Sequence, residues 1–248
     1  MTCYPQKIAA KFMISPSTLR NYEAKGLIPP AERGVNGYRM FTEIHEAYLA
    51  CIQAMSPAFG MEVTTEALHR LREDKLHEAL WIVKEKEVSL YEGKGKLVQL
   101  VREMERYASA NGASEAEEWL TIREAAARTG VPKSAIRYWE KAGLLAVQRD
   151  PANEYRRYRT PHLFVIRLLQ VLQSAVYSET TVKLKQSIAA AEQTDIPQIQ
   201  ELAANILAFL DKVNASQIRG IAYLYRLIRM TKAEGLDESQ PWEENLLP

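Results

Sequence analysis

Two short runs of the sequence concentrate side chains that donate hydrogen bonds to anionic or carbonyl oxygens. They are Ser17, Thr18, Arg20, Asn21, Tyr38 and Arg39 in the first run, and Lys133, Ser134, Arg137, Tyr138, Tyr155, Arg156 and Arg157 in the second. Guanidinium groups and phenol hydroxyls suit phosphate oxygens, whereas small hydroxyl and amide groups suit the edges of bases. The chemistry that these runs favour is binding of a polyanion, provided that secondary-structure elements place them on one surface.

An internal repeat relates the two runs. A shift of 117 residues aligns the segment from Ala9 to Met55 with the second run without gaps, with twelve identities in 47 positions. Chance would give about three, so the chain contains a duplicated unit. The identical pairs include Arg20 with Arg137, Glu23 with Glu140, and Tyr38 with Tyr155.

Each copy has the same expected layout. A short helix begins near Gln6 or Arg123, and a turn follows at Met13-Ile14 or Gly130-Val131. A second helix, opened by Ser15-Pro16 in the first copy, ends at a glycine, Gly26 or Gly143, because glycine favours the left-handed cap. A hairpin then carries the Tyr-Arg pair, and its Asn36-Gly37 turn is a strong hairpin signal. Helix, turn, helix and basic hairpin predict a winged helix-turn-helix, whose second helix enters the major groove.

The residues of this stretch resemble the MerR (mercury-resistance regulator) family of bacterial proteins. The first copy reads Thr-Leu-Arg-Asn-Tyr-Glu from Thr18 and Asn-Gly-Tyr-Arg-Met-Phe from Asn36, and the second reads Ala-Ile-Arg-Tyr-Trp-Glu from Ala135. The resemblance covers about residues 1–74 and 119–190. It implies that the helix Arg, the first Tyr and the wing Tyr-Arg pair contact the DNA backbone. These roles pass to Arg20, Tyr38 and Arg39, and to Arg137, Tyr138, Tyr155 and Arg156.

The two copies depart from the family pattern at three positions. Asn21 replaces the first Tyr, which would change that phosphate contact, and Trp139 replaces a core Tyr. Glu154 replaces the hairpin glycine, so we expect a different turn in the second copy. We also expect Tyr22 and Trp139 to lie in the core, and Glu23 and Glu140 to form local ion pairs rather than act as catalytic acids.

Charge is distributed unevenly although the formal net charge is only +1. Residues 120–175 hold ten Lys or Arg against four acids, whereas residues 1–60 hold six against four, so the second copy should bind DNA more strongly. The stretch from Ala233 holds five acids and neither Lys nor Arg. Such a segregated field attracts polyanions to one face, although a solvated charged surface is the plainer explanation of charge alone.

Other chemistry classes find little support in the sequence. The two cysteines, Cys3 and Cys51, provide neither a disulfide framework nor a thiolate metal site, and the four histidines do not cluster with them. Mercury- and copper-sensing members of the family place cysteines at the ends of the long helix, where this chain has none, so we expect no metal and no cofactor. No apolar run spans a bilayer, and no catalytic motif is found. We expect a cytoplasmic, nucleoid-associated protein that is not an enzyme.

Long helices should connect the copies. Apolar residues predict one helix from Lys75 to Tyr107, with Leu76, Leu80, Val83, Tyr91, Val98, Val101 and Met104 on one face. A second seam runs through Ile199, Leu202, Ile206, Phe209 and Val213, and Asn214-Ala-Ser216 leaves two helices possible there. The expected domains are 1–74 and 119–192 (winged modules), 75–108 and 193–232 (helices), 109–118 (linker) and 233–248 (acidic tail).

The fold class expected is therefore mainly α, with two winged helix-turn-helix domains whose long helices pack as an antiparallel bridge. The expected function is a DNA-binding transcriptional regulator in which one chain acts as a pseudo-dimer on an imperfect inverted repeat. Its partners would be double-stranded DNA and, by the resemblance, RNA polymerase at a promoter, with helix pairing inside the chain or with a second chain; no membrane is expected.

Two alternatives stay open. The protein could be an architectural or accessory DNA-binding protein, or a protein-interaction adapter that no longer reads DNA. A small ligand would have to lie between helices, and the aromatic residues that could contact it are Trp81, Tyr91, Phe209, Tyr223 and Tyr225. Packing between helices explains these aromatic residues more simply.

Overall fold

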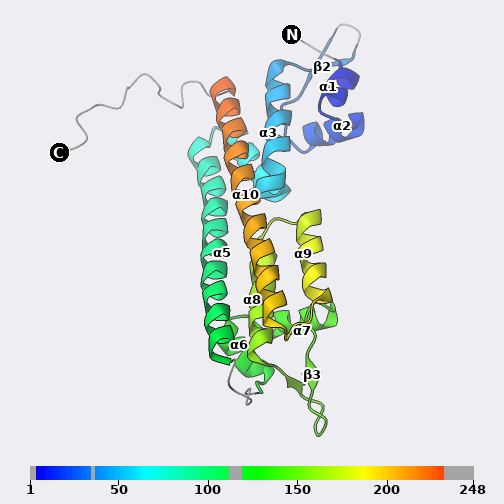
Figure 1. The fold of residues 1–248 in the computed structure, drawn as a ribbon. Coiled ribbons are helices and arrows are strands. Elements are labelled where there is room, and N and C mark those ends of the chain that lie inside the picture. The colour runs from blue at the N-terminus through cyan, green and yellow to red at the C-terminus, as the bar shows by residue number, and fades with distance from the viewer. Residues whose placement is uncertain (1–3, 35–36, 112–118, 232–248) are drawn as a thin grey trace, which may run out of the picture. The chain divides into compact units, whose positions relative to one another are not determined.

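The computed structural model describes residues 4–34, 37–111 and 119–231, which form ten helices and two small antiparallel sheets (Figure 1). The chain divides into two compact units, residues 1–86 with 215–248 and residues 87–214. The expected mainly α class is confirmed. Within the described residues, no helix is long and apolar enough to cross a membrane.

The first unit contains one winged helix-turn-helix. Its elements are α1 (Pro5–Lys11), α2 (Pro16–Ala24), β1 (Glu32–Arg33), β2 (Arg39–Met40), α3 (Glu43–Phe59) and α4 (Met61–Arg72), joined by parts of α5 (Leu76–Asn111) and α10 (Ile196–Thr231). Apolar residues of α1, α2, α3 and α4 form one core, and Leu224, Leu227 and Ile228 of α10 belong to it. The core of this module is therefore completed by a helix that comes much later in the sequence.

The second unit repeats this plan. Its elements are α6 (Ile122–Thr129), α7 (Lys133–Lys141), β3 (Gln148–Arg149), β4 (Arg156–Arg157), α8 (Thr160–Ser174) and α9 (Glu179–Ala190), joined by the rest of α5 and α10. Leu97, Leu100 and Met104 of α5 pack into its core together with the first half of α10. Figure 1 shows α5 and α10 running antiparallel in this unit. All five residues of the expected α10 seam are buried.

Capping residues set the helix boundaries as the sequence predicts. The Ser15 hydroxyl accepts a hydrogen bond from the Thr18 backbone N–H at 3.0 Å, and Pro16 occupies the first turn of α2. Gly26 and Gly143 follow α2 and α7 in the left-handed region, with φ of 69° and 71°. A side chain at either glycine would strain this backbone, which explains why both copies stop their second helix at glycine.

The turn between the first two helices also uses left-handed backbone in both copies. The second copy places Gly130 there with φ 71°, whereas the first places Met13 with φ 51°. Met13 is almost fully exposed, so its side chain gains little packing energy to offset this conformation. The first copy is therefore strained at a position where the second is not.

The two wings differ in length, in agreement with the expected difference in turn. In the first wing Arg33 pairs with Arg39, so the five residues 34–38 connect the strands. In the second wing Arg149 pairs with Arg156, and six residues, 150–155, connect them. Glu154 nevertheless keeps the left-handed backbone of the first wing's glycine, with φ of 60° against 75°. The side chains of Asp150 and Asn153 accept backbone hydrogen bonds from Ala152 and Tyr155, which stabilise this longer turn.

The repeat extends through the long helices. Both α5 and α10 have 36 residues, and their corresponding ends are 120 positions apart. At this offset Ala79, Val83, Leu97, Leu100 and Met104 of α5 match Ile199, Ala203, Gln217, Gly220 and Leu224 of α10, and all ten are buried. The offset exceeds 117 partly because five residues, 191–195, precede α10, whereas three residues, 73–75, precede α5. The two long helices are therefore structural counterparts.

Some expectations for these helices were wrong. Leu80 and Tyr91 are exposed, and Ala79, Leu97 and Leu100 occupy the buried face of α5 instead. Of the five aromatic residues expected to pack between helices, Trp81 and Tyr91 are 73% and 79% exposed, and Tyr225 is also exposed. The α10 segment is one helix rather than two, because Asn214 and Ser216 cost a helix little when they lie outside its buried stripe.

Several expectations concern residues outside the described ranges. These are Cys3, the Asn36 position of the first hairpin turn, most of the linker (112–118) and the acidic tail (233–248). The expected domain boundaries stay predictions. The two compact units group residues that contact one another, and each unit combines segments from both copies of the repeat.

Candidate functional site

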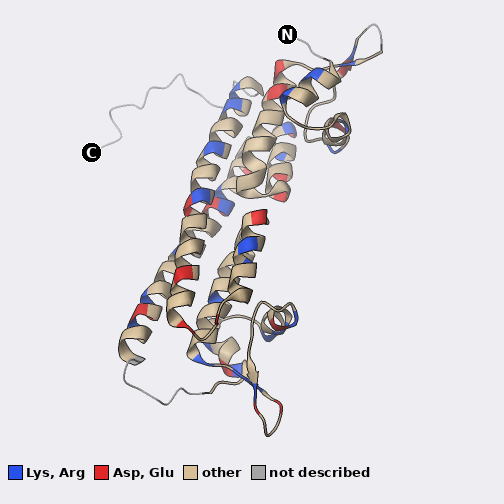
Figure 2. Cartoon of the chain, turned by 45° about the vertical axis from the view of Figure 1, so that its right-hand side comes forward, with Lys and Arg blue, Asp and Glu red and all other residues tan. Residues whose placement is uncertain are grey.

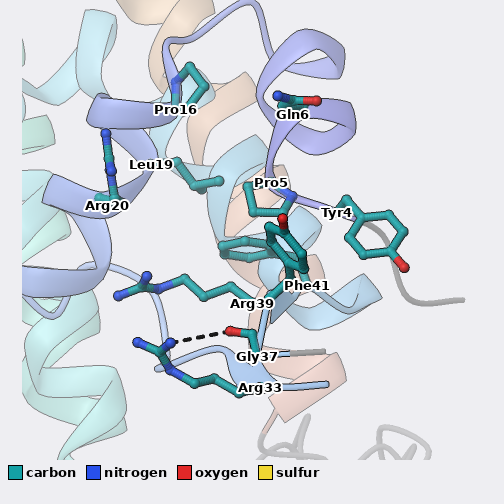
Figure 3. A pocket seen from close by; sticks show the side chains of 11 residues that line it. Tyr4, Pro5, Gln6, Pro16, Leu19, Arg20, Arg33, Gly37, Arg39 and Phe41 are labelled. Atoms are coloured by element: carbon teal, nitrogen blue, oxygen red, sulfur yellow. Dashed lines mark hydrogen bonds between the residues drawn. The ribbon is translucent and has the colours of Figure 1, made fainter. Parts of the chain in front are cut away.

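The first module has a basic groove between α2 and its wing. A cavity of about 700 Å³ is lined by Tyr4, Pro5, Gln6, Pro16, Leu19, Arg20, Arg33, Gly37, Tyr38, Arg39 and Phe41. Figure 3 shows the Arg33 and Arg39 side chains extending side by side from the wing, with Arg20 of α2 next to them. Tyr4 and Tyr38 meet edge to face at 6.3 Å between ring centroids. We call this cavity the basic groove.

The wing is held to α2 by an ion pair. The Arg39 Nε donates to the Glu23 carboxylate at 2.8 Å, and the Glu23 side chain is only 14% exposed. The second Glu23 oxygen accepts the Ala31 backbone N–H at 3.0 Å. Arg33 donates to the Gly37 carbonyl across the hairpin at 3.2 Å. Arg39 thus fixes the orientation of the wing.

The second module repeats this ion pair with one addition. The Arg156 Nε donates to Glu140, and the Tyr158 hydroxyl, which Phe41 replaces in the first module, donates to the other oxygen of the same carboxylate. Burial, together with the bond to Glu140, raises the pKa of Tyr158 far above its usual range. Glu23 and Glu140 form ion pairs as expected, but each partner is a wing arginine 16 positions away rather than a local residue.

The residues expected to contact DNA lie mostly at the surface. Those exposed are Ser17, Arg20 and Asn21 of α2, Lys133, Ser134, Arg137 and Tyr138 of α7, and the wing tyrosines Tyr38 and Tyr155. Those half-buried are Thr18, Arg39, Arg156 and Arg157. Each module therefore brings its own set together on one helix and one wing, and the role of each residue in binding stays a prediction.

The N-termini of the two second helices differ. The α2 terminus holds a hydroxyl cluster, because Ser15 Oγ lies 2.6 Å from Ser17 Oγ and 2.8 Å from Thr18 Oγ1. The α7 helix begins after Pro132, and no side chain caps it. Since the start of this helix faces the base edges in a winged helix-turn-helix, the two modules have different hydrogen-bonding surfaces there.

A tryptophan and two arginines give the second module a further feature. The Arg159 and Arg157 guanidinium carbons lie 4.3 Å and 5.4 Å from the centre of the Trp119 ring. Arg157 also pairs with Asp150 in the wing turn, and the pKa of Asp150 is lowered, first by the Ala152 N–H and then by Arg157. The stacking orders both arginines beside the second wing.

Sequence reasoning missed Arg33, Arg149, Tyr4 and Arg159. The first two could have been found from the hairpin, since antiparallel pairing places them opposite the wing arginines. No sequence signal placed Tyr4 against Tyr38, because that contact depends on how α1 packs on the wing. Figure 2 shows that residues of both charge signs occur near both wings and along the long helices.

The expected core residues are confirmed. Trp139 is buried, Tyr22 packs partly buried against the first core, and Cys51 is fully buried. Burial raises the pKa of the Cys51 thiol to about 12, so burial favours the neutral thiol over the thiolate. In the described part of the chain, no group of three or more His, Cys, Asp or Glu is arranged to hold a metal ion.

Each compact unit thus contains one winged helix-turn-helix module. A model of the MerR family regulatory proteins matches residues 5–41 and 121–158, which run from α1 and α6 to the ends of the two wings. Both winged modules of the chain are therefore similar to this family, and the matched module is duplicated.

Individual relatives match part of the chain. The chain is 29% identical over 103 residues to the HTH-type transcriptional regulator CueR of Salmonella typhi and to that of Salmonella typhimurium. The aligned region covers 41% of this chain and 66% of each relative, so it spans just under two thirds of their length. No solved structure matches the chain.

Proposed function

We propose that the protein is a sequence-specific DNA-binding transcriptional regulator in which a single chain acts as a pseudo-dimer. Each module would read one half of an imperfect inverted repeat in double-stranded DNA. The two matches to the MerR family model and the likeness to a transcriptional regulator support the general role. The packing of each module with a helix from the other copy supports the pseudo-dimer.

That packing is the observation that carries the proposal. In the first unit the module packs against the last turns of α10, and in the second unit the module packs against the second half of α5. Each long helix thus starts from one module and ends in the core of the other. In a two-fold symmetric dimer of single-module chains, the same exchange would occur between two subunits. Here one chain supplies both copies.

The phosphate contacts would come from both parts of each module. Arg20 and Arg137 are exposed on the second helices, and Tyr38 and Tyr155 are exposed on the wings. The wing arginines would act through the ion pairs that orient the wings, and would contact phosphate with their outer nitrogens. Removing one phosphate-binding arginine should lower the salt dependence of binding by about one unit of slope.

The two reading helices are unequal, and this should appear in the target. The first offers the hydroxyls and amide of Ser17, Thr18 and Asn21. The second offers an ammonium group at Lys133 and hydroxyls at Ser134 and Tyr138. Different donors select different bases, so the two half-sites should differ.

The proposal includes bending or untwisting of promoter DNA. Bending a site of 20–30 base pairs costs on the order of 1–6 kcal/mol, so the protein must hold its two modules rigidly to supply that energy. The long helices would provide this rigidity, because each has 36 residues and contributes to both cores.

The test is selection of binding sites from a random double-stranded DNA pool by the full chain. The proposal predicts one asymmetric inverted repeat. Arg20→Ala and Arg137→Ala should each weaken binding through one half-site only. Lys25→Ala, just past the end of α2, is the matched control and should leave selection unchanged.

The other outcomes each identify an alternative. Recovery of a single half-site would mean that one module reads DNA, and the more basic second module would be the expected one. Salt-sensitive binding with no consensus would favour an architectural role. Absence of binding would contradict the proposal and leave the adapter function.

A further inference from the structure

We propose that the acidic tail, residues 233–248, binds the basic groove of the first module and competes there with DNA. The inference rests on the proposed function, because it assigns a regulator to the same groove. It follows from the charge of the groove, the sequence of the tail and the place where α10 ends.

The groove is suited to an acidic peptide. Three arginines, Arg20, Arg33 and Arg39, line it, and no acid is among its described lining residues. Apolar surface from Leu19 and Phe41 lies beside them (Figure 3). With about 700 Å³ of space, the groove is large enough for several side chains. Arginine forks bind carboxylates in two-bond geometry, as they bind phosphates.

The second module is less suited to the same peptide. Strand register makes Arg149 the counterpart of Arg33, and Asp150, the first residue of the longer second turn, places an acid directly beside it. Asp150 also pairs with Arg157 and thereby occupies one of the basic groups of the second wing. The tail is therefore assigned to the first module.

The tail carries the complementary charge. Its acids are Glu234, Asp237, Glu238, Glu243 and Glu244, and it contains neither lysine nor arginine. The apolar residues Leu236, Trp242, Leu246 and Leu247 lie among and after these acids. A segment with one sign of charge is attracted to a surface of the opposite sign, and its apolar side chains match the apolar part of the groove.

The end of α10 places the tail within reach. Met230 of α10 and Lys11 at the end of α1 line the same small cavity. Gln6, near the start of α1, lines the basic groove. Because α1 has seven residues, the two cavities are separated by about 10 Å of helix. The 17 residues after Thr231 reach up to about 55 Å when extended, so the tail needs only part of its length.

Tethering makes weak binding effective. A tethered segment acts at an effective concentration of the order of millimolar, so a tail with a dissociation constant of about 0.1 mM would weaken DNA binding about tenfold. The effect should decline as salt rises, because charge attraction is screened over about 10 Å at an ionic strength of about 0.1 M.

Direct binding is measured without DNA. The probe is a fluorescein-labelled peptide of residues 233–248, and the receptor is the full chain with its five tail acids changed to the corresponding amides. Fluorescence anisotropy should show salt-sensitive binding that is lost when Arg20→Ala and Arg33→Ala are added. The pair Lys25→Ala and Lys75→Ala removes the same charge outside the groove and should leave binding unchanged.

Competition is measured with a short duplex of arbitrary sequence. The chain with the amide tail should bind it about tenfold more tightly than the natural chain at low salt. A matched chain instead carries amides at five acids of α4, α5 and α10: Glu62, Glu85, Glu92, Glu105 and Glu201. Its net charge changes equally, and it should bind DNA nearly as the natural chain does.

The outcomes separate the tail from the proposed function. Equal tightening in both amide chains, or peptide binding that survives loss of Arg20 and Arg33, would overturn the tail proposal and leave DNA binding intact. Peptide binding to the groove of a chain that binds no DNA would support the tail contact and contradict the regulator function.

Discussion

At the scale of single residues, Met13 shows how the two copies have diverged. It occupies the left-handed turn position that Gly130 holds in the second module. Left-handed backbone costs a residue with a side chain roughly 1–2 kcal/mol, and the exposed Met13 recovers little of it by packing. Met13→Gly should therefore raise the free energy of unfolding by about 1 kcal/mol in urea titrations, after the greater freedom of unfolded glycine is allowed for.

The reverse change tests the same explanation. Gly130→Ala should lower the free energy of unfolding by about 1 kcal/mol. If Met13→Gly destabilises the protein instead, then the Met13 side chain contributes contacts that outweigh the strain.

The buried thiol of Cys51 gives a pH dependence at the same scale. Its pKa is raised from 9.0 to about 12 by burial, so the folded thiol stays neutral while the unfolded thiol ionises. As the pH rises, Cys51 therefore ionises in the unfolded protein before it ionises in the folded protein. The free energy of unfolding keeps its full contribution from Cys51 below pH 9 and loses it as the pH rises toward 12. In that pH window the free energy of unfolding should fall by up to about 1.4 kcal/mol per pH unit.

The measurement is urea unfolding at several pH values above the ordinary thiol pKa. Cys51→Ala should remove this part of the slope, although Tyr48, whose pKa burial also raises, keeps a remainder at still higher pH. In a Cys3→Ser chain, a thiol reagent should leave Cys51 unmodified until the protein unfolds. Rapid modification of the folded chain would contradict the burial of this residue.

At the scale of elements, Gly220 fixes how closely α10 approaches α3. A Cβ at this position would lie 2.9 Å from the Phe59 ring and 3.4 Å from the Ala54 carbonyl oxygen. Its counterpart in α5 is Leu100, which is buried in the second unit. Equivalent positions of the two long helices thus differ: the first unit has a glycine in close contact with α3, and the second unit has a large buried side chain.

Substitutions at these two positions should both destabilise the protein, for opposite reasons. Gly220→Leu, which installs the counterpart residue, should cost about 1–3 kcal/mol of unfolding free energy through overpacking. Leu100→Ala should cost about 2–5 kcal/mol through the cavity that it leaves. Calorimetry of both variants checks the prediction, and a neutral Gly220→Leu would show that α10 does not pack closely on the first module.

Helix ends could be predicted from the sequence, but the buried face of a long helix could not. The helix stops at Gly26 and Gly143 and the core position of Trp139 follow from local rules of capping and periodicity, and the structure confirms them. The buried face of α5 does not follow, because the partner helix decides that small Ala79 faces inward while large Trp81 is exposed.

The candidate site was predictable to a similar extent. The repeat and the hairpin signal identified the wing arginines, and Glu23 and Glu140 were expected to form ion pairs. The sequence did not show that these arginines and glutamates pair with each other, because that contact joins residues 16 positions apart through the packing of wing on helix. The basic groove depends on Arg33, which only strand register places opposite Arg39. Long-range geometry of this kind has no local sequence signal.

At the scale of the whole molecule, the duplicated chain has two modules and two long helices, and each long helix contributes to the core of the other copy's module. The first core includes Leu227 of α10, and the second includes Leu97 of α5, so neither core is complete without a helix that begins in the other copy. A dimer of single-module chains would obtain these helices from a second subunit. Here both are in one chain, and we therefore expect a single chain to occupy both half-sites.

The most direct test of this account is the stoichiometry of the complex between the full chain and its selected DNA site, measured by native mass spectrometry and by analytical ultracentrifugation. The account predicts one chain per duplex, with both half-sites protected from cleavage and a monomeric chain in the absence of DNA. Two chains on each duplex, one per half-site, would contradict it.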